Sequence, residues 1–463
     1  MLSKENTDLL CRVGPGTPMG SLMREYWLPA TYGWELEPDG KALRVRLLGE
    51  DLLAWRDTNG TPGFIQENCP HRGASLFFGR NEECGLRCVY HGWKYNTDGN
   101  CVDMPNEPEE SNFKEKIKPL TYKAADWGGI TWIYMGPNQD NPPGLPEWEW
   151  AMVPENQVMH SHKAVYECNF MQALEGELDT THVYFLHSRL DPAASPGYGL
   201  HVRDKRARLE IMDTNYGVIY GARRQEDEQH YYWRSTQFLF PIYGMFPGGG
   251  EDGTVPLSIY LPIDDHHTLH WGLWWHPSQP LPRWGTKPVP QVFNDSGVLI
   301  GGVGPMKPEQ KGRFFADWWP EACKENDFLV NPEVKKTKSF TGIASVRLQD
   351  DTVITSMGRI MNRTQEHLGT ADATIIRVRR RMIEAAKAFA ERGVRPPCSD
   401  HPEMYRVRSC QAILPADADW RAAMDDWHSA RTSEHPTGGF QPQRDYVEGG
   451  AGTRRRTYGQ TTP

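Results

Sequence analysis

The sequence predicts an α+β protein in which a small antiparallel β domain precedes a larger domain of strands and helices. Three observations support this prediction. Short runs of alternating apolar and polar residues lie between turn signals from Leu43 to Trp132. The stretch 136–144, rich in Gly, Pro and Asn, is typical of a linker. Beyond it lie longer strand-like runs and one long amphipathic helix.

The first 25 residues have helical character with a break at Gly14–Pro18, and we expect them to pack on the larger domain. Turn signals at Asn59-Gly60 and Asp98-Gly99-Asn100 separate strands of the small domain. In the larger domain, strand-like runs cover 216–223, 232–238 and 257–263. The expected organisation is a helical segment, the small β domain, the larger domain and a surface tail, at 1–25, 26–140, 141–434 and 435–463.

Apolar residues from Ile375 to Phe389 follow helical spacing, and Gly393 and Pro396 end the helix. Four arginines accompany them. We expect these arginines to form a solvated helix face, the alternative being a docking face for an acidic partner; they are Arg377, Arg379, Arg380 and Arg381.

The composition excludes several classes. Lys and Arg number 51 and Asp and Glu 60, so the formal charge of 51 − 60 = −9 argues against a nucleic-acid-binding protein. No apolar run approaches the ~18 residues of a membrane span, and no secretory signal is visible at the N-terminus. Nine cysteines in 463 residues are too sparse for a disulfide scaffold, so we expect a reducing cytoplasm.

Two Cys–His pairs form the strongest motif in the sequence. Cys69 and His71 lie two apart, and Cys88 and His91 lie three apart after a gap of sixteen residues. Two thiolates and two imidazoles suit tetrahedral zinc or a [2Fe–2S] cluster with one Cys₂ and one His₂ iron. In each pair the Cys precedes the His, so each loop can give one ligand to each iron, whereas zinc fingers pair like with like. With Pro70, Gly73 and Gly92-Trp93 around it, the pattern resembles a Rieske cluster-binding motif.

A second group of candidate ligands follows a helical stretch that begins at Asn169. His182 and His187 are five residues apart, which an ideal helix would splay, but a helix end between them would bring both to one metal. Taken alone, two such histidines could equally be structural. A Rieske centre supplies electrons, however, and two histidines with one carboxylate form the Fe(II) site that activates O₂.

Almost the whole chain resembles the catalytic α subunit of Rieske non-haem iron aromatic-ring oxygenases, of the phthalate 4,5-dioxygenase-like branch. The resemblance implies a Rieske domain and a catalytic domain with a helix-grip-like central antiparallel sheet packed by helices. The family motif D-x2-H-x4-H falls on Asp179, His182 and His187. Further matching stretches are 12–20, 75–83, 101–108, 366–370 and the arginine-rich helix.

The resemblance also implies a third iron ligand, an Asp just before a helix, in the stretch 348–358. Asp350 aligns best and Asp351 is the alternative; both could instead cap the helix. The family assembles rings of three, so we expect a homotrimer or stacked trimers. In such a ring Asp179 is expected to bridge His91 of one subunit and His182 of its neighbour, in line with the role of carboxylates that orient metal-bound imidazoles. A local helix carboxylate is the other interpretation of Asp179.

The expected activity is that of a terminal oxygenase that uses O₂ and external electrons to hydroxylate an aromatic acid, as in phthalate-like ring dihydroxylation. Alternatives are a monooxygenase or O-demethylase of a methoxylated or ether-bearing aromatic acid, an electron carrier without oxygenase activity, and a zinc-stabilised binding module. No Gly-rich dinucleotide fingerprint is present, so NAD(P)H would act through a separate flavin or iron–sulfur reductase. A substrate carboxylate calls for an arginine, with candidates Arg203, Arg206, Arg223, Arg224 and Arg234.

Overall fold

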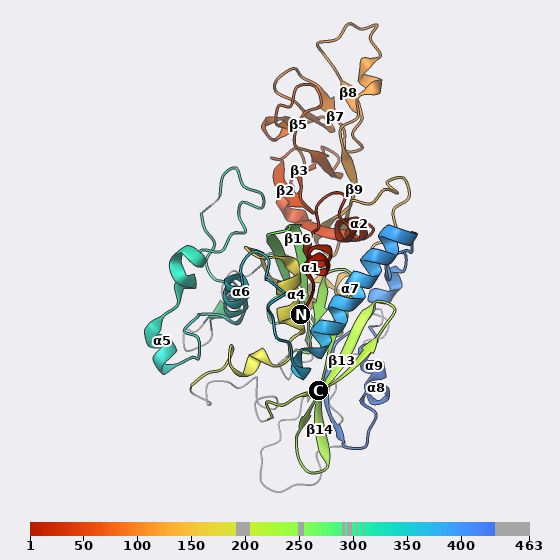
Figure 1. Cartoon of the computed structure of the whole chain (residues 1–463). Coiled ribbons are helices and arrows are strands. Elements are labelled where there is room, and N and C mark those ends of the chain that lie inside the picture. The colour runs from red at the N-terminus through yellow and green to blue at the C-terminus, as the bar shows by residue number, and fades with distance from the viewer. Residues whose placement is uncertain are drawn as a thin grey trace.

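The computed structural model describes residues 1–190, 204–248, 254–288, 292–293, 299–301, 303–308 and 310–430. The proposed tail 435–463 and Arg203 lie outside the described residues. In Figure 1 the chain begins with two helices, α1 (Lys4–Cys11) and α2 (Pro18–Arg24), on either side of the predicted break. Ser3 and Thr17 cap them through their side chains. Both helices pack against α7 (Ala373–Arg392), the predicted long helix, which ends at Gly393.

Two antiparallel sheets form the N-terminal part. The first has the order β1-β10-β9-β4-β3-β2, with bounds Trp27–Tyr32, Ile130–Tyr134, Thr121–Trp127, Pro62–Gln66, Glu50–Arg56 and Leu43–Leu47. The second has the order β5-β6-β7-β8, with bounds Arg80–Glu82, Gly85–Arg87, Lys94–Tyr95 and Cys101–Asp103. Short 3₁₀ turns lie at η1 (Gly33–Glu35), η2 (Leu76–Phe78) and η3 (Phe113–Lys116). The small antiparallel β domain of the prediction is thus present.

An 8-stranded antiparallel sheet organises the rest of the described chain. Its path is β11-β17-β16-β15-β14-β13-β12, and β20 pairs with β14; the bounds are Val158–Tyr166, His267–Trp275, Val255–Asp264, Tyr243–Met245, His230–Leu239, Gly217–Gln225, Arg208–Asp213 and, for β20, Gln411–Pro415. A separate hairpin is formed by β18 (Val292–Phe293) and β19 (Leu299–Gly301). The three strand-like runs predicted from sequence correspond to β13, β14 and β16.

Helices flank the large sheet. On one side α4 (Phe170–Leu178) packs on β14 to β17, and α6 (Val346–Ser356) packs on α4. The other helices and 3₁₀ turns are α3 (Glu149–Met152), α5 (Pro332–Thr337), α8 (Trp420–Ala423), α9 (Asp425–His428), η4 (Glu155–Gln157), η5 (His182–Tyr184), η7 (Lys324–Leu329), η8 (Thr370–Asp372) and η9 (Pro402–Tyr405). The expectation of a central antiparallel sheet packed by helices is therefore confirmed.

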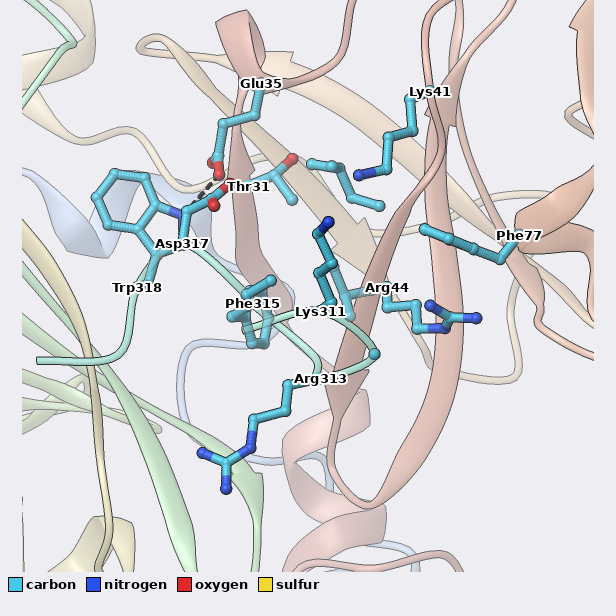
Figure 2. Close-up of a pocket in the computed structure, with 14 residues that line it drawn as sticks. Thr31, Glu35, Lys41, Arg44, Phe77, Lys311, Arg313, Phe315, Asp317 and Trp318 are labelled. Atoms are coloured by element: carbon cyan, nitrogen blue, oxygen red, sulfur yellow. Dashed lines mark hydrogen bonds between the residues drawn. The ribbon is translucent and has the colours of Figure 1, made fainter. Parts of the chain in front are cut away.

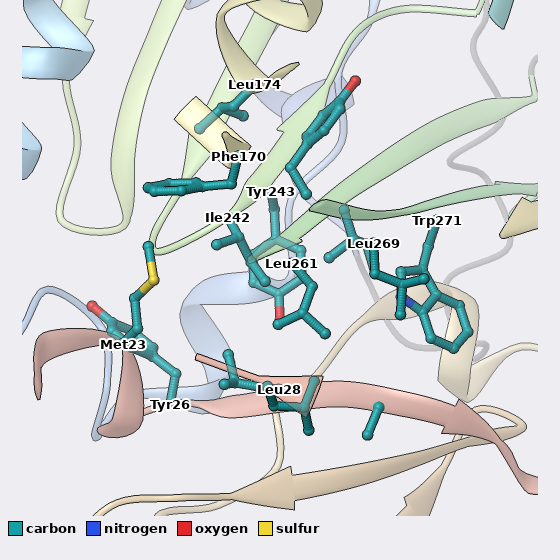
Figure 3. Packing of buried hydrophobic residues seen from close by; sticks show 14 of the residues in the cluster. Met23, Tyr26, Leu28, Phe170, Leu174, Ile242, Tyr243, Leu261, Leu269 and Trp271 are labelled. Carbon is teal, nitrogen blue, oxygen red and sulfur yellow. The ribbon is translucent and has the colours of Figure 1, made fainter. Parts of the chain in front are cut away.

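One hydrophobic core joins the N-terminal segment, the first sheet and the large sheet. Figure 3 shows Met23 and Leu28 packed near Phe170 of α4 and Leu261 and Trp271 of the large sheet. A separate cluster that includes Trp55, Leu86 and Tyr95 lies under the second sheet. Since burial of large apolar side chains is the main stabilising term, the two parts of the chain are held together by shared core rather than by the linker.

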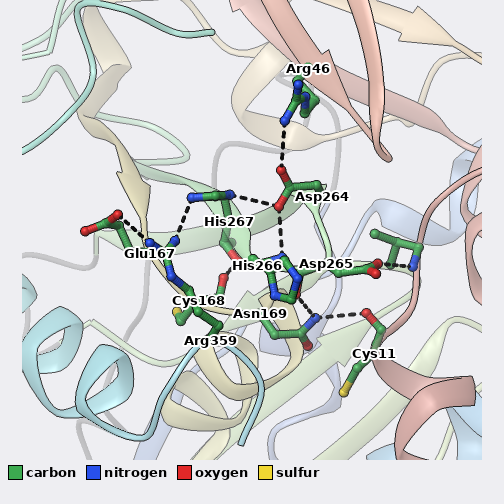
Figure 4. A network of polar contacts seen from close by, with 12 residues as sticks. Cys11, Arg46, Glu167, Cys168, Asn169, Asp264, Asp265, His266, His267 and Arg359 are labelled. Carbon is green, nitrogen blue, oxygen red and sulfur yellow. Dashed lines mark hydrogen bonds and ion pairs between the residues drawn. The ribbon is translucent and has the colours of Figure 1, made fainter. Parts of the chain in front are cut away.

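Two polar contacts reinforce this junction. Glu35 forms an ion pair with the fully buried Lys163 of β11 at 2.6 Å, and it accepts a hydrogen bond from Trp318 Nε1 at 2.7 Å. Beside Glu35 lies a cavity of about 50 Å³, which Figure 2 shows between β2 and the loop 311–318. Arg46 of β2 binds Asp264, which contacts His267, as Figure 4 shows. These side chains therefore connect the first sheet to the β16–β17 hairpin.

The prediction that the four arginines of α7 form a solvated face is wrong for Arg379. Arg379 is buried and binds both Glu175 of α4 and Glu366. Arg380 is exposed and pairs with Glu384, as a solvated face requires. A buried arginine with two carboxylate partners is compatible with helical spacing because periodicity does not distinguish a paired buried charge from an exposed one.

Candidate metal centres

Two loops of the N-terminal part place Cys69, His71, Cys88 and His91 together. In each loop the backbone N–H of a glycine four residues after the Cys donates to the Cys carbonyl, at 2.9 Å for Gly73 and 3.0 Å for Gly92. Both glycines have positive φ, 76° and 79°, which a side chain would strain. The two loops therefore have the same tight form, although their histidines differ in spacing.

The two loops face each other, and the side chains meet His with His and Cys with Cys. The His71 and His91 rings lie 4.4 Å apart between centroids, and His71 stacks on Trp93 at 4.3 Å. Both cysteines are buried, and burial together with Cys88 raises the pKa of the Cys69 thiol. The buried His71 Nδ1 has no hydrogen-bond partner among the described residues. Buried polar atoms are normally paired, so this nitrogen fits a metal-ligand role.

The sequence motif included Trp93, but sequence reasoning overlooked Tyr95. Tyr95 Oη lies 3.3 Å from Cys69 Sγ, and Trp93 supports the ring of His71. Burial, with the neighbouring charges of His71 and Arg72, lowers the pKa of His91, so its ring is available as a neutral ligand near pH 7. Tyr95 lies four residues after His91, and this short distance from the second Cys–His pair could have singled it out.

The second centre forms where α4 ends. Asn169 caps the start of α4, the helix ends at Leu178, and His182 begins the single turn η5. This interruption brings the Nε2 atoms of His182 and His187 to 3.1 Å. The predicted helix end between the two histidines is thus that of the short turn η5, at Tyr184, whereas α4 ends before both.

Asp350 completes the group from α6. Its Oδ1 lies 3.1 Å from His187 Nε2 and 3.6 Å from His182 Nε2, and the three donor atoms lie within 4.8 Å of one another. Burial alone would raise the pKa of Asp350, but His187, His182 and Arg347 outweigh it and lower the pKa. Two imidazole nitrogens facing each other beside a carboxylate oxygen suit a divalent cation.

The structure distinguishes the two candidate aspartates. Asp351 points away from the histidines, and its Oδ1 accepts from Thr355 Oγ1 at 2.9 Å. Burial raises the pKa of Asp351 to about 8. The expectation that the ligand Asp lies just before a helix is wrong: α6 begins at Val346, capped by Ser345, so Asp350 is inside it. One α-helical residue step of about 100° separates the directions of the two neighbours.

Asp179 lies immediately after α4 and beside His182. Its Oδ1 accepts from the Thr181 N–H at 2.6 Å and from Thr181 Oγ1 at 2.7 Å, and its Oδ2 lies 3.7 Å from His182 Nδ1. Burial would lower the pKa of His182, but Asp179 and Asp350 outweigh it and raise the pKa. Asp179 is thus held by its own loop with one oxygen toward the imidazole.

Comparison with known families now adds to the geometry. Residues 26–118 match the Rieske [2Fe–2S] domain, and residues 133–285 and 315–437 match the LigXa C-terminal domain like family. The chain belongs to the Rieske non-haem iron oxygenases. As a member of this family, the oxygenase is an oxidoreductase whose cofactors are a [2Fe–2S] cluster and a mononuclear iron.

Relatives of this oxygenase cover nearly its full length. It is 36% identical to the 3-chlorobenzoate-3,4-dioxygenase oxygenase subunit of Comamonas testosteroni, over 92% of this chain and 98% of that protein. It is 37% identical to the phthalate 4,5-dioxygenase oxygenase subunit of Pseudomonas putida, over 91% and 94%. The 5,5'-dehydrodivanillate O-demethylase oxygenase subunit of Sphingobium is 32% identical, over 83% and 80%.

Solved structures share the fold of this oxygenase. NdmA of Pseudomonas putida CBB5 with caffeine has a TM-score of 0.55 at 18% identity, over 83% of this chain and 95% of that one. Dicamba monooxygenase bound to dicamba has a TM-score of 0.54 at 14% identity, over 80% and 100%. Within the described residues of the oxygenase, no helix combines the length and apolarity that a membrane crossing needs.

Proposed function

We propose that this chain is the terminal oxygenase that hydroxylates an aromatic acid, with phthalate-like ring dihydroxylation as the principal reaction. In this proposal Cys69, His71, Cys88 and His91 hold the [2Fe–2S] cluster, and His182, His187 and Asp350 hold the iron. The observation that carries it is the convergence of these three donor atoms, with both Nε2 atoms facing one another, in a chain that also carries the Rieske loops. The iron, when bound with open positions, supplies the binding and activation of O₂.

Arg224 is the proposed anchor of the substrate carboxylate. Arg224 is 1% exposed, and its Nη2 donates to the Thr180 carbonyl at 2.9 Å and to Thr180 Oγ1 at 3.0 Å. Thr180 lies in the sequence between Asp179 and the two histidines. Its Nε donates to Tyr184. Its buried Nη1 has no hydrogen-bond partner among the described residues. A charged Nη1 whose N–H groups have no partner among the described residues suits a charge-assisted bond to a ring carboxylate.

The other candidate arginines differ in whether their side chains lie on the same face of the large sheet as Arg224. Tyr220 on this strand donates to the Leu178 carbonyl of α4, so Arg224, four residues on, shares the face toward the iron ligands. Arg234 of β14 lies opposite Ala222 and shares that face too. Arg223 instead stacks over Tyr231 at 4.3 Å, and Arg206 is exposed. Arg234 is therefore the proposed second cation of the site.

We propose a ring of three subunits, or stacked rings, as the working assembly. In Figure 1 the β5–β8 sheet lies at one end of the molecule, and β2, β3 and β9 lie between this sheet and the helices α4 and α6. Apolar side chains are exposed near both metal sites: Val89 (58%) and Tyr90 (53%) in a cluster loop, and Phe185 (54%) and Phe340 (49%) near the iron ligands. Head-to-tail contact would cover both patches.

Such a ring would bring His91 of one subunit beside Asp179 of the next. Asp179 Oδ2, directed toward His182 Nδ1, would then accept from both imidazoles and orient them. Electrons would come from NAD(P)H through a separate flavin or iron–sulfur reductase, a proposal supported by the lack of a dinucleotide fingerprint and by relatives named as oxygenase subunits.

The test combines metal analysis with product analysis. Anaerobically purified protein should be red-brown, contain about three irons per chain, and show a low-average-g EPR signal on reduction. With a reductase and ¹⁸O₂, a ring dihydroxylation puts two labelled oxygens into a benzoate or phthalate, a monooxygenation puts in one, and an O-demethylation releases formaldehyde from methoxybenzoates. Cluster iron alone, with no O₂ uptake after Fe(II) is added back, would instead support an electron carrier, and a colourless zinc protein would contradict the proposal.

A further inference from the structure

Arg347 lies between two carboxylates in the interior of the larger domain. It precedes Asp350 by one turn of α6, and its Nη1 lies 3.1 Å from Glu177 Oε2 and 3.8 Å from Asp350 Oδ2. The side chains of Arg347 and Glu177 are 14% and 4% exposed. The guanidinium therefore meets the oxygen of Asp350 that faces away from the histidines, while Oδ1 faces them.

Glu177 is itself held in place. Tyr260 of β16 donates from Oη to Glu177 Oε2 at 2.9 Å, and Arg347 Nη2 donates to Ser258 of the same strand at 3.4 Å. The Glu177 chain also lies tightly over Gly244, where an added Cβ would come within 2.6 Å of Glu177 Cγ. Glu177 of α4, two residues before Asp179, thus connects the large sheet to α6, the helix that carries Asp350.

We propose that Arg347, held by Glu177 and Tyr260, is a positioning residue that fixes how Asp350 presents itself to the iron. The proposal rests on the ligand set of the proposed function. Arg347 holds its positive charge 3.8 Å from Oδ2, so that Oδ1, on the side of the histidines, is the oxygen that Asp350 would present to the metal.

Charge and orientation predict opposite effects on metal affinity, which makes the proposal testable. A positive guanidinium near a metal ligand repels a divalent cation, so its removal should strengthen metal binding if charge alone matters. If Arg347 orients Asp350, its removal should weaken binding, since loss of a group that orients a metal ligand typically costs about 10–100-fold in affinity.

The experiment uses the full chain with its cluster intact and the mononuclear iron removed by a chelator. Anaerobic titration with Fe(II), and with Co(II) as a spectroscopic probe, gives the dissociation constant. We expect Arg347→Met to weaken binding about tenfold or more. Because this variant leaves Glu177 buried without its partner, the double variant Arg347→Met/Glu177→Gln is measured as well and should bind as weakly.

Two further variants complete the test. Tyr260→Phe removes one hydroxyl and should weaken binding in the same direction by a smaller factor. Arg359→Met, three residues beyond the end of α6, removes exposed contacts with Glu167 and His267 and should leave the affinity unchanged. Unchanged or tighter binding in both the Tyr260 and the double variant would overturn the positioning role. Failure of the unmodified chain to bind a third iron would instead contradict the proposed function itself.

Discussion

Gln349 Oε1 lies 2.7 Å from His187 Nδ1, and the other end of the same amide donates from Nε2 to the Ile343 carbonyl at 3.1 Å. Since Nε2 of the amide must donate to a carbonyl, its oxygen faces the imidazole, and His187 Nδ1 must carry the proton. This leaves the lone pair of His187 on Nε2, directed at Asp350 and His182.

Replacing Gln349 should therefore loosen the iron. Gln349→Leu removes the acceptor that sets the tautomer of His187, and we expect a fall of about 10–100-fold in Fe(II) affinity. The measurement is iron per chain after anaerobic gel filtration. Gln349→Glu keeps an acceptor oxygen and is the control that should retain more iron; equal losses in the two variants would contradict the tautomer argument.

The two neighbouring aspartates should behave differently. Asp350→Asn should lose the mononuclear iron and keep the cluster, because it removes the charged ligand oxygen. Asp351→Asn should keep both, because burial raises the pKa of Asp351 to about 8 and a neutral amide resembles its protonated form near pH 7. Iron quantification with EPR of the reduced cluster checks both. Loss of the third iron from the Asp351 variant would reverse the assignment.

Asp179→Asn tests the proposed route between subunits. The amide retains the size of the carboxylate but cannot accept from two imidazoles as a charged group does. We expect both metals to remain while reoxidation of the reduced cluster by O₂ and substrate slows by at least about tenfold. Stopped-flow absorbance follows the cluster directly. Unaltered reoxidation in an intact trimer would place the electron route elsewhere.

Arg224→Gln should affect the substrate more than the metal. Loss of a charged hydrogen bond of about 1.5–3 kcal/mol predicts a KM for the aromatic acid about 10–100-fold higher, with iron content retained. Arg223→Gln is the matched control on the opposite face of β13 and should leave KM unchanged. The two variants are compared by O₂ uptake against acid concentration, and equal KM values would remove Arg224 from the carboxylate site.

The contacts of Asp264 with Arg46 and His267, drawn in Figure 4, predict that the stability of the fold depends on pH. Burial alone would raise the pKa of Asp264, but His267, the His266 N–H and Arg46 outweigh it and lower the pKa to about 2. A lowered acid pKa stabilises the fold above about pH 4, and this contribution is lost as the pH falls from about 4 towards 2.

Asp264→Asn should accordingly lower the free energy of unfolding at pH 6. The expected loss is only on the order of 1 kcal/mol, because Asp264 and its partner Arg46 are partly exposed to solvent. The difference from the unmodified chain should shrink as the pH falls below 4. Urea unfolding at several pH values measures it, and a difference that is constant with pH would contradict the pKa argument.

Local patterns predicted several of the elements and the Cys–His candidates, whereas the iron ligands were expected from the family resemblance. The strands β13, β14 and β16 and the helix α7 follow from alternation and helical spacing, and the Cys–His pairs follow from their spacing. These features depend on neighbours along the chain.

Features that depend on distant contacts were not predictable in this way. Arg379 is buried only because Glu175 of α4 and Glu366 meet it, and helical spacing contains no information on such partners. Gln349 adjoins a ligand in sequence and could have been suspected. Arg347 and Glu177 have no such signal, since their roles arise from the packing of α6 against α4 and the sheet.

The helices α4 and α6 approach so closely that an added Cβ on Gly176 would come within 2.9 Å of Ile354 Cδ1, and Gln172 of α4 binds the carbonyls of Ile354 and Gly358. Under the proposed function, Asp350 lies on α6 and the two histidines follow shortly after the end of α4, so the iron ligands depend on this helix pair. The arginines that would face the ring acid are instead on β13 and β14. Metal retention and substrate choice thus belong to different stretches of backbone. Such a division lets new specificities evolve, or be engineered, strand by strand while the oxidising centre stays intact.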